Sequence, residues 1–499
     1  MVFTNEVFGY ENNLVRIDVT SNSNGKGMEI FGIHDAKIND LKTKIPEALK
    51  NIDVDCNKIS VSAVPPEELK RGEYAFPISL AIYCEQKGIT ENVFCCGNLE
   101  SWQGVVTDVC VCGIHDSIIS STNKSISYAI LPSKCREQIT GNIKVAFVSN
   151  LEQAFKALDA IGTDKESKFF TITEEEKRDD FTVEFPEYSK GITDETPFLP
   201  SCSEKTALAV ILAAAGKHNI LLWGAYNEKN SAIYALQEIT PLLTDSESKS
   251  VEKIYSLAGI PSPTSKHSVP FRVPHFTASI EGICGGGINC RPGEVSLAHN
   301  GILGLIEATE FKTSVLQILR VPLETKQITL ARAGRSTTFP ANFQLAMAAN
   351  SCPCGNYGVE GKLCLCSSRA IELYWKKFSA PLLDRIDIIV KLEKAKPDDR
   401  IITYGEAREM VRKAIQRQRA MRTYNKDLLS LIQTENAQKA FDEIFRKNKL
   451  SERRARSLKN VSQTVADIRN CETVTEEDVR KAIEFVRLPD EMPPSNRRI

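Results

Sequence analysis

The sequence of 499 residues lacks an excess of charge of either sign, because 63 Lys and Arg residues face 64 Asp and Glu residues. A formal net charge of −1 excludes a globally basic coat protein for nucleic acid, although a local basic surface stays compatible with it. The sequence also lacks a secretory signal at its start and an apolar run long enough to span a bilayer. Its most apolar stretch, residues 207–215, is followed by Lys217 and His218. We therefore expect a cytoplasmic protein with no membrane partner.

Cysteine, in contrast, is frequent, with 15 residues in the chain. The number is odd, and a chain of this length needs no disulfides, so we expect most cysteines to be small buried apolar residues. Four of them are spaced differently, as Cys352-x-Cys354 and Cys364-x-Cys366. Two close pairs joined by a short glycine-containing loop suit a tetrahedral zinc site made of thiolates. The alternative is four reduced thiols in a loop.

The first part of the sequence mixes strand and helix patterns. Residues 15–19 and 58–62 alternate apolar and polar side chains, which predicts strands. Residues 36–50 carry apolar side chains at helical spacing, and residues 76–83 predict a second helix. This mixture indicates an α+β domain. Residues 165–195 follow with many acidic side chains and little apolar periodicity, which predicts a solvated linker.

The pattern changes near residue 199. Residues 207–215 predict a buried helix, and short apolar runs predict strands at 219–223, 301–306, 343–349 and 386–392. Short apolar strands separated by helices indicate a parallel sheet covered on both faces. Beyond Pro397 the sequence predicts only helices, over 404–421, 434–447, 451–469 and 475–487. Thr475 and Asp478 have the spacing of a capping box at the start of the last one.

The loop after the first of these strands occupies the place of a phosphate-binding loop. Such a loop needs glycines for close backbone approach, a lysine for phosphate charge and a Ser or Thr for Mg²⁺. In residues 224–231 only Gly224 and Ser231 match, because Asn230 stands at the lysine position and Lys229 comes one residue early. Adjacent residues on a helix point about 100° apart, so we expect the side chain of Lys229 to point elsewhere. This segment alone predicts an ordinary strand, turn and helix.

Longer signatures follow this segment, at residues 270–275, 285–287, 292–301, 344–355 and 381–387. Together, and in this order, they resemble the magnesium-chelatase-like AAA+ family of bacterial ComM/YifB proteins, a resemblance that covers nearly the whole chain. It implies a multidomain α/β fold with an N-terminal Lon-protease-like α+β domain, an AAA+ P-loop-type α/β core and a C-terminal helical lid domain. The expected boundaries are 1–164 for the first domain, 165–198 for an acidic linker, 199–396 for the core, 397–490 for the helical domain and 491–499 for a tail.

ComM-type proteins are hexameric, ATP-driven motors that move branched DNA during recombination in natural transformation. The resemblance therefore implies single-stranded or branched DNA as a partner. It also implies a ring, made of identical subunits or shared with an intact paralogue. A true magnesium-chelatase subunit is a weaker alternative, because the N-terminal domain matches ComM-type proteins and not the chelatase subunit.

The resemblance implies roles for individual residues of this sequence. Glu307 corresponds to the glutamate that activates water, and Asn350 corresponds to sensor 1. Arg385 corresponds to the arginine finger, which is offered to a neighbouring subunit, and Arg453 corresponds to sensor 2. Ile306 stands where the family has the aspartate that coordinates Mg²⁺. ATP and Mg²⁺ are thus the implied cofactors.

Two replacements bear on the mechanism, because Asn230 and Ile306 remove one positive charge and one metal ligand. Phosphoryl transfer depends on positive charge placed against developing negative charge, so each loss weakens transition-state stabilisation. We expect ATP to be hydrolysed poorly or not at all, and these losses put its binding in question. One alternative is a compensated site in which Lys229 reaches back to the phosphates. Another is a scaffold that forms rings or binds DNA without turnover.

A β-hairpin is predicted over residues 325–339. Related ring helicases place such a hairpin in the central pore, which makes Lys326, Arg332 and Arg335 candidate contacts to DNA phosphates. A solvated surface hairpin is the alternative. The N-terminal domain offers no serine in a small-residue turn before a helix, so we expect no peptidase activity, and Ser79 is expected to be a packing residue.

Overall fold

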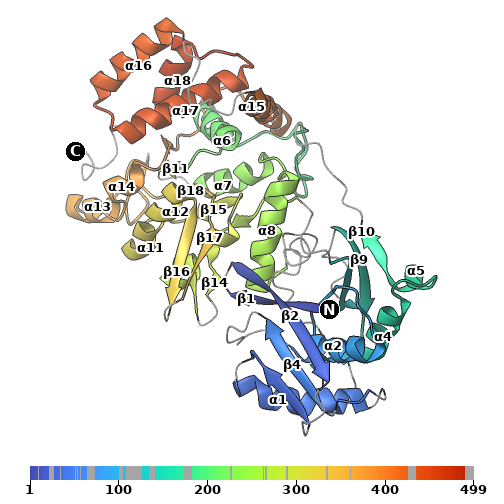
Figure 1. The fold of residues 1–499 in the computed structure, drawn as a ribbon. Coiled ribbons are helices and arrows are strands. Elements are labelled where there is room, and N and C mark those ends of the chain that lie inside the picture. Colours follow the sequence, from blue (N-terminus) through green and yellow to red (C-terminus); the bar gives the residue numbers. More distant parts are fainter. Residues whose placement is uncertain are drawn as a thin grey trace. The chain divides into compact units, whose positions relative to one another are not determined.

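The computed structural model describes most of the chain up to residue 488. Outside the description are residues 9, 22–26, 34, 51, 53, 57, 65–73, 101–104, 108–125, 134–140, 174–181, 225–227, 262, 264–266, 288–289, 333–334, 360, 425–433 and 489–499. The chain divides into two compact units, one formed by residues 1–177 and 252–262 and one by residues 178–251 and 263–499 (Figure 1). Among the described residues, no helix has both the length and the apolar character that crossing a bilayer requires.

Unit one is built on an eight-stranded sheet of mixed direction, in the order β10-β9-β8-β5-β1-β2-β4-β3. Its strands are β1 (Val2–Phe8), β2 (Glu11–Ser21), β3 (Met28–Phe31), β4 (Ile59–Val64), β5 (Val93–Cys95), β8 (Tyr128–Pro132), β9 (Gly141–Val148) and β10 (Thr171–Thr173). A separate small hairpin consists of β6 (Asn98–Glu100) and β7 (Val105–Thr107). The helices are α1 (Asp35–Lys50), α2 (Ala75–Lys87), α4 (Leu151–Ala160) and α5 (Glu166–Phe169).

The sheet of unit one separates two cores, because successive side chains of a strand point to opposite faces. Val2 and Val93 join the core formed with α1, α2 and α4, whereas their neighbours Phe3 and Phe94 join the second core. The strands predicted at 15–19 and 58–62 and the helices predicted at 36–50 and 76–83 are confirmed as β2, β4, α1 and α2. Ser79 is fully buried in α2 and donates a hydrogen bond to the Ala75 carbonyl at 2.8 Å, as a packing residue does.

Unit two contains a five-stranded parallel sheet in the order β12-β15-β18-β11-β19. The strands of unit two are β11 (Ile220–Trp223), β12 (Phe271–Arg272), β13 (Gly285–Gly286), β14 (Arg291–Pro292), β15 (Ile302–Leu305), β16 (Gln327–Arg332), β17 (Arg335–Pro340), β18 (Gln344–Ala349) and β19 (Ile388–Lys391). The four strands predicted from apolar runs are confirmed as β15, β18, β11 and β19, and so is their parallel arrangement.

Helices surround this sheet and continue to the end of the described chain. They are α6 (Glu204–Gly216), α7 (Glu228–Glu238), α8 (Asp245–Ala258), which contributes residues to both units, α9 (Ile280–Cys284), α10 (Glu294–Leu297), α11 (Thr313–Ile318), α12 (Arg320–Thr325), α13 (Ser368–Trp375), α14 (Ala380–Leu383), α15 (Tyr404–Tyr424), α16 (Glu435–Asn448), α17 (Glu452–Ile468) and α18 (Glu476–Val486). The last four match the predicted C-terminal helices, and Thr475 and Asp478 form the predicted capping box. The fold is therefore a multidomain α/β fold with a C-terminal helical domain.

Residues 182–198 differ from the solvated linker that the composition predicted. Val183 and Phe198 are 5% and 2% exposed and join the core of unit two. The guanidinium of Arg408 in α15 lies 3.5 Å from the ring centre of Tyr188 and donates to the Glu238 carbonyl at 2.9 and 2.7 Å. Spaced apolar and aromatic side chains therefore hold this segment against the core, despite the acidic residues that precede it.

Arg454 connects the C-terminal helices to the sheet of unit two. Its guanidinium is 3% exposed and donates hydrogen bonds to the carbonyls of Leu383 (2.7 Å), Ile386 (2.8 Å) and Val486 (3.0 Å). Burial lowers its pKa to about 10, while Asp384 and other nearby acid charge oppose this effect, so the side chain is charged at neutral pH. One side chain thus joins the turn after α14, the segment entering β19 and the end of α18.

Replacing Arg454 with leucine should lower the free energy of unfolding by about 3–5 kcal/mol, because a buried hydrogen-bonded charge would be lost and three buried carbonyls would lose their donor. Denaturant unfolding followed by circular dichroism and tryptophan fluorescence would measure the loss. The neighbouring Arg453 is a matched control, since its side chain is 45% exposed and Arg453→Leu should cost less than about 1 kcal/mol. Equal losses for the two variants would contradict the role given to Arg454.

Candidate nucleotide site

Three of the predicted site residues follow neighbouring parallel strands. Gly224 follows β11, Glu307 comes two residues after β15, and Asn350 follows β18. Since β18 pairs with both other strands, the carboxyl ends of all three meet at one edge of the sheet. The Gly224 N–H donates to the Ala349 carbonyl at 3.1 Å and the Ala308 N–H to the Ala348 carbonyl at 2.8 Å. In open parallel sheets this edge is where ligands bind.

The backbone at Gly224 has a conformation that favours glycine, and the missing side chain lets another group approach the backbone closely. Its φ of +150° is one that side-chain-bearing residues rarely adopt, and a Cβ there would lie 3.3 Å from the Leu392 carbonyl oxygen. The next residues, 225–227, lie outside the described part of the chain, and α7 begins at Glu228. The strand, the glycine and the helix start therefore have the order of a phosphate-binding loop.

Lys229 is enclosed rather than exposed. Its side chain belongs to the first turn of α7 and the residue is 3% exposed. Burial lowers the pKa of Lys229, and the carboxylates of Glu307 and Glu228 oppose that lowering. The ammonium group therefore lies within the electrostatic reach of Glu307. Asn230 is half-buried, and its Oδ1 has no hydrogen-bond partner within the described structure, whereas Ser231 is exposed.

Glu307 has an unusual backbone conformation. Its φ is +55°, in the left-handed region that costs energy for a residue with a side chain, and its carbonyl accepts the Glu310 N–H at 2.7 Å. Such strain is often found at functional positions. The preceding Ile306 packs against the core of unit two, so the position of the metal-binding aspartate supplies no oxygen.

Asn350 has a neighbour that the sequence pattern does not indicate. It lies beside Tyr374, whose hydroxyl accepts a hydrogen bond from Thr309. Burial raises the pKa of Tyr374, so this hydroxyl stays protonated at neutral pH. Tyr374 lies on α13, and no spacing in the sequence connects it to Asn350.

Arg385 and Arg453 lie together, but at a different place. The Arg385 carbonyl accepts a hydrogen bond at 2.8 Å from Asn219, which precedes β11, so its backbone lies at the amino edge of the sheet. Both guanidinium groups reach the carboxylate of Glu324 at the end of α12: Arg385 through Nη2, and Arg453 through Nη2 at 2.9 Å from Oε1. Both arginines lower the pKa of Glu324, and the effect of Arg385 is the larger one. No spacing in the sequence relates Glu324 to either arginine.

The four clustered cysteines converge in space. The Sγ atoms of Cys352 and Cys354 are 3.4 Å apart, and each lies 3.6 Å from that of Cys364. Together with Cys366, all four sulfur atoms lie within 4.8 Å of one another, as a group that could hold a metal ion. Nearby, the Trp375 indole donates to the Ser351 carbonyl at 3.0 Å, which fixes the start of this loop.

The predicted hairpin is confirmed as β16 and β17, which pair from Gln327 and Pro340 at the base to Arg332 and Arg335 at the tip. Lys326 directly follows the last residue of α12 and precedes the base of the hairpin. A strand rises about 3.3 Å per residue, so the tip of the hairpin lies about 20 Å away from Lys326. Burial lowers the pKa of Lys326, and Asp387 opposes the effect. The structure thus separates Lys326 from the two arginines.

Comparison with known families agrees with this arrangement. The profile described as magnesium chelatase, subunit ChlI, matches residues 201–400, and the profile of the ChlI C-terminal region matches residues 403–486. The sheet and the helical domain of unit two are therefore those of a magnesium-chelatase-like AAA+ protein.

Individual relatives narrow this assignment. The chain is 27% identical to competence protein ComM of Haemophilus influenzae over 97% of each chain, and 26% identical to uncharacterized protein YifB of Escherichia coli over 97% of this chain and 96% of the relative. An uncharacterized protein of Mycobacterium tuberculosis is 38% identical over 42% of each chain, so that match spans less than half the length of the relative. The chain belongs to the ComM/YifB family of magnesium-chelatase-like proteins.

Proposed function

We propose that this chain is a ring-forming AAA+ protein of DNA recombination whose own nucleotide site hydrolyses ATP slowly or not at all. One observation carries the proposal. The carboxyl edge of the sheet brings Gly224, Glu307 and Asn350 together, while the positions of the lysine and the metal-binding aspartate hold Asn230 and Ile306. The proposed site keeps the groups that orient and activate water and lacks groups that neutralise phosphate charge.

The missing groups determine the expected rate. Mg²⁺ and lysine stabilise the charge that spreads over the transferred phosphoryl group, and removing one such electrostatic contact typically costs about 3–4 kcal/mol. Two losses would then slow hydrolysis by several orders of magnitude. Ser231 is the remaining hydroxyl that could serve a nucleotide-bound Mg²⁺ in this loop.

Lys229 is a cation of this segment that could compensate. Its burial argues against this alternative, because the ammonium group would have to leave its enclosed position to reach a phosphate. The attraction of the ammonium group to Glu307 opposes the same movement.

Arg385 and Arg453 support the ring. Their shared partner Glu324 is 53% exposed. The phosphate of a nucleotide bound to a neighbouring subunit could therefore approach and replace this carboxylate between the two guanidinium groups. Neither arginine has such a use in an isolated subunit. A catalytically inactive ring scaffold is the second candidate, and it would keep this interface while lacking turnover.

DNA is the proposed partner of the ring. The full-length similarity to competence protein ComM suggests a role in natural transformation, and the family activity would be ATP-dependent branch migration of DNA. Arg332 and Arg335, which end the paired part of the hairpin, would supply phosphate contacts in such a ring.

ATP turnover by the purified protein, with and without branched DNA, tests the proposed nucleotide site. We expect turnover near background, and an increase of at least tenfold in the double variant Asn230→Lys/Ile306→Asp, because it restores the charge and the metal ligand. Glu307→Gln added to that variant should abolish the gain. A different result would show a compensated site instead: the wild-type protein would hydrolyse ATP well above background, and Lys229→Gln would abolish that turnover.

DNA binding tests the hairpin separately from turnover. The double variant Arg332→Gln/Arg335→Gln should weaken binding of single-stranded or branched DNA at least tenfold and reduce its dependence on salt, because two phosphate contacts would be lost. Fluorescence anisotropy over a series of salt concentrations measures both effects. Lys326→Gln at the base of the hairpin is the control and should change affinity little. Equal effects of the two changes would count against a role for the tip.

We further propose that the four-cysteine cluster holds a structural zinc ion. With Zn–S bonds of about 2.3 Å, tetrahedral geometry requires sulfur atoms about 3.8 Å apart. The three separations among Cys352, Cys354 and Cys364 are 3.4 to 3.6 Å, close to this value, and all four sulfur atoms lie within 4.8 Å of one another. Cys352, Cys354, Cys364 and Cys366 would all be ligands, which leaves no open position for catalysis.

Metal analysis of the purified protein should find about one zinc per chain. Cys354→Ser/Cys366→Ser should lose the zinc and lower the melting temperature, because the loop would lose its cross-link. Cys471→Ser is a suitable control, since Cys471 is a free cysteine outside the cluster, and should leave the zinc content unchanged. An unchanged zinc content in the double variant would place the metal elsewhere.

A further inference from the structure

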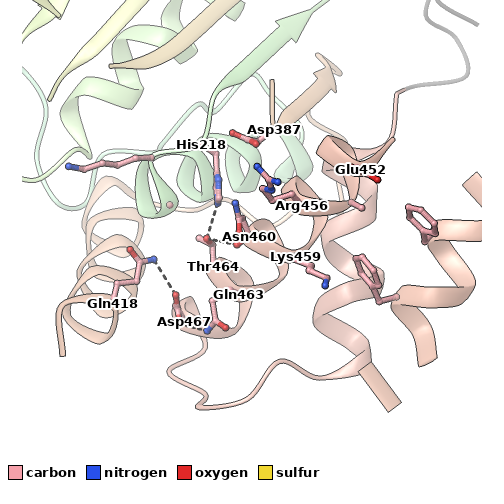
Figure 2. Close-up of a pocket in the computed structure, with 15 residues that line it drawn as sticks. His218, Asp387, Gln418, Glu452, Arg456, Lys459, Asn460, Gln463, Thr464 and Asp467 are labelled. Atoms are coloured by element: carbon pink, nitrogen blue, oxygen red, sulfur yellow. Dashed lines mark hydrogen bonds between the residues drawn. The ribbon is translucent and has the colours of Figure 1, made fainter. Parts of the chain in front are cut away.

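A cavity of unit two lies away from the predicted nucleotide edge. It has a volume of about 1000 Å³ and is formed by the end of α6, by α15, α16 and α17, and by Asp387 (Figure 2). His218 and Asp387 precede β11 and β19, so the cavity is at the amino edge of the sheet, opposite the edge of Gly224. Its size is that of a small-molecule site.

Two of the acids in this cavity are engaged by the protein. Asp387 accepts hydrogen bonds from the Ser457 hydroxyl at 2.6 Å and from the Asn219 N–H at 3.1 Å. Asp467 accepts from Gln463 at 2.8 Å and from Gln418 at 3.1 Å, the second of which is drawn in Figure 2. Burial raises the pKa of Asp467, and the Arg417 guanidinium, whose Nε lies 3.5 Å from Oδ1, opposes this rise and compensates the carboxylate charge.

The other two groups considered in this cavity, His218 and Glu452, repel a bound anion only weakly. His218 shares a hydrogen bond of 2.8 Å with the Thr464 hydroxyl, and burial lowers its pKa, so its ring is neutral (Figure 2). Glu452 lies in the first turn of α17, where the positive end of the helix dipole compensates a carboxylate. The cavity therefore has little uncompensated negative charge.

Basic and amide groups of α17 line the same cavity and are available to a ligand. Arg456, Lys459 and Asn460 are spaced i, i+3 and i+4, which places them on one face of the helix. Within the described chain, Arg456 has neither an ion pair nor a hydrogen bond to its side chain, and the residue is exposed. Figure 2 shows the three side chains beside one another on this helix.

Two phenyl rings of α16 form the adjacent wall. Phe441 and Phe445 are inclined by only 15°, with ring centres 6.4 Å apart. The Lys459 ammonium lies 4.9 Å from the ring centre of Phe441. Phe445 is 36% exposed, so its ring can receive a flat group. An aromatic ring beside arginine and lysine is the combination that binds a base together with its phosphate.

We propose that this cavity binds a nucleoside phosphate, with the phosphate held by Arg456, Lys459 and Asn460 and the base against Phe445. The ligand can be a free nucleotide or one nucleotide unit of a single strand, since both present the same chemistry. This site is separate from the proposed ATP site, because the two lie at opposite edges of the sheet.

The test is a calorimetric titration of the full chain with adenosine monophosphate, an eight-residue oligothymidylate and inorganic phosphate. We expect at least one of the two nucleotide probes to bind more tightly than phosphate. Arg456→Gln/Lys459→Gln should weaken that binding at least tenfold. The matched control Arg446→Gln/Lys447→Gln removes the same charge from exposed residues of α16 outside the cavity lining and should change affinity less than twofold.

Two further variants separate the parts of the proposal. Phe445→Ala should weaken the nucleotide probes and leave phosphate unaffected, and it provides a second readout if the double variant fails to fold. Lys229→Gln, at the other edge, should retain the binding, whereas loss in this variant would assign the probe to the proposed ATP site. Binding of the mononucleotide alone identifies a free nucleotide, and binding of the oligonucleotide alone identifies a strand. No binding of either, equal binding of phosphate, or no effect of Arg456→Gln/Lys459→Gln would overturn the proposal.

Discussion

The buried guanidinium of Arg454 fixes the position of α17. Two candidate ligand sites depend on this position: the cluster of Arg385, Arg453 and Glu324, and the cavity at the amino edge of the sheet. Its hydrogen bonds to the carbonyls of Leu383, Ile386 and Val486 hold the first turns of α17 against the sheet. The neighbouring Arg453 can then reach Glu324 and Arg385, while Arg456 lines the cavity at the amino edge. A charge that is costly to bury is stabilised here by three carbonyls, and it orients two exposed arginines.

At the opposite edge, the parallel sheet brings together residues that are far apart in the sequence. Gly224, Glu307 and Asn350 meet because β11, β15 and β18 are neighbours with their carboxyl ends aligned. The proposed nucleotide site would differ from an efficient one in charge rather than in framework, since Ile306 and Asn230 stand where the family resemblance places a carboxylate and an ammonium group. Burial lowers the pKa of Lys229 beside this edge, and the negative charge of Glu307 opposes the lowering.

Local patterns were sufficient to predict most elements of the fold, because apolar periodicity and capping depend on neighbouring residues. Four of the five sheet strands of unit two, the C-terminal helices and the Thr475 capping box are confirmed for this reason, whereas the two-residue strand β12 was not predicted. Partners distant in the sequence could not be predicted, as Glu324 and Tyr374 show, since no spacing relates them to Arg385 or Asn350. The packing of residues 182–198 was missed because acidic composition outweighed a few aromatic side chains that are buried only in the folded chain.

The two edges of the sheet also separate the two groups of residues on which the proposed function depends. Asn230 and Ile306 belong to the proposed nucleotide site, whereas Arg385 and Arg453 lie with Glu324 away from that site. In the proposed ring, the carboxyl edge of one subunit would meet the arginines of another, so a subunit without hydrolysis of its own would still contribute charge to its neighbour. In a ring of identical copies every interface would then be impaired equally. In a ring shared with an intact paralogue, only the interfaces that use this carboxyl edge would be slow.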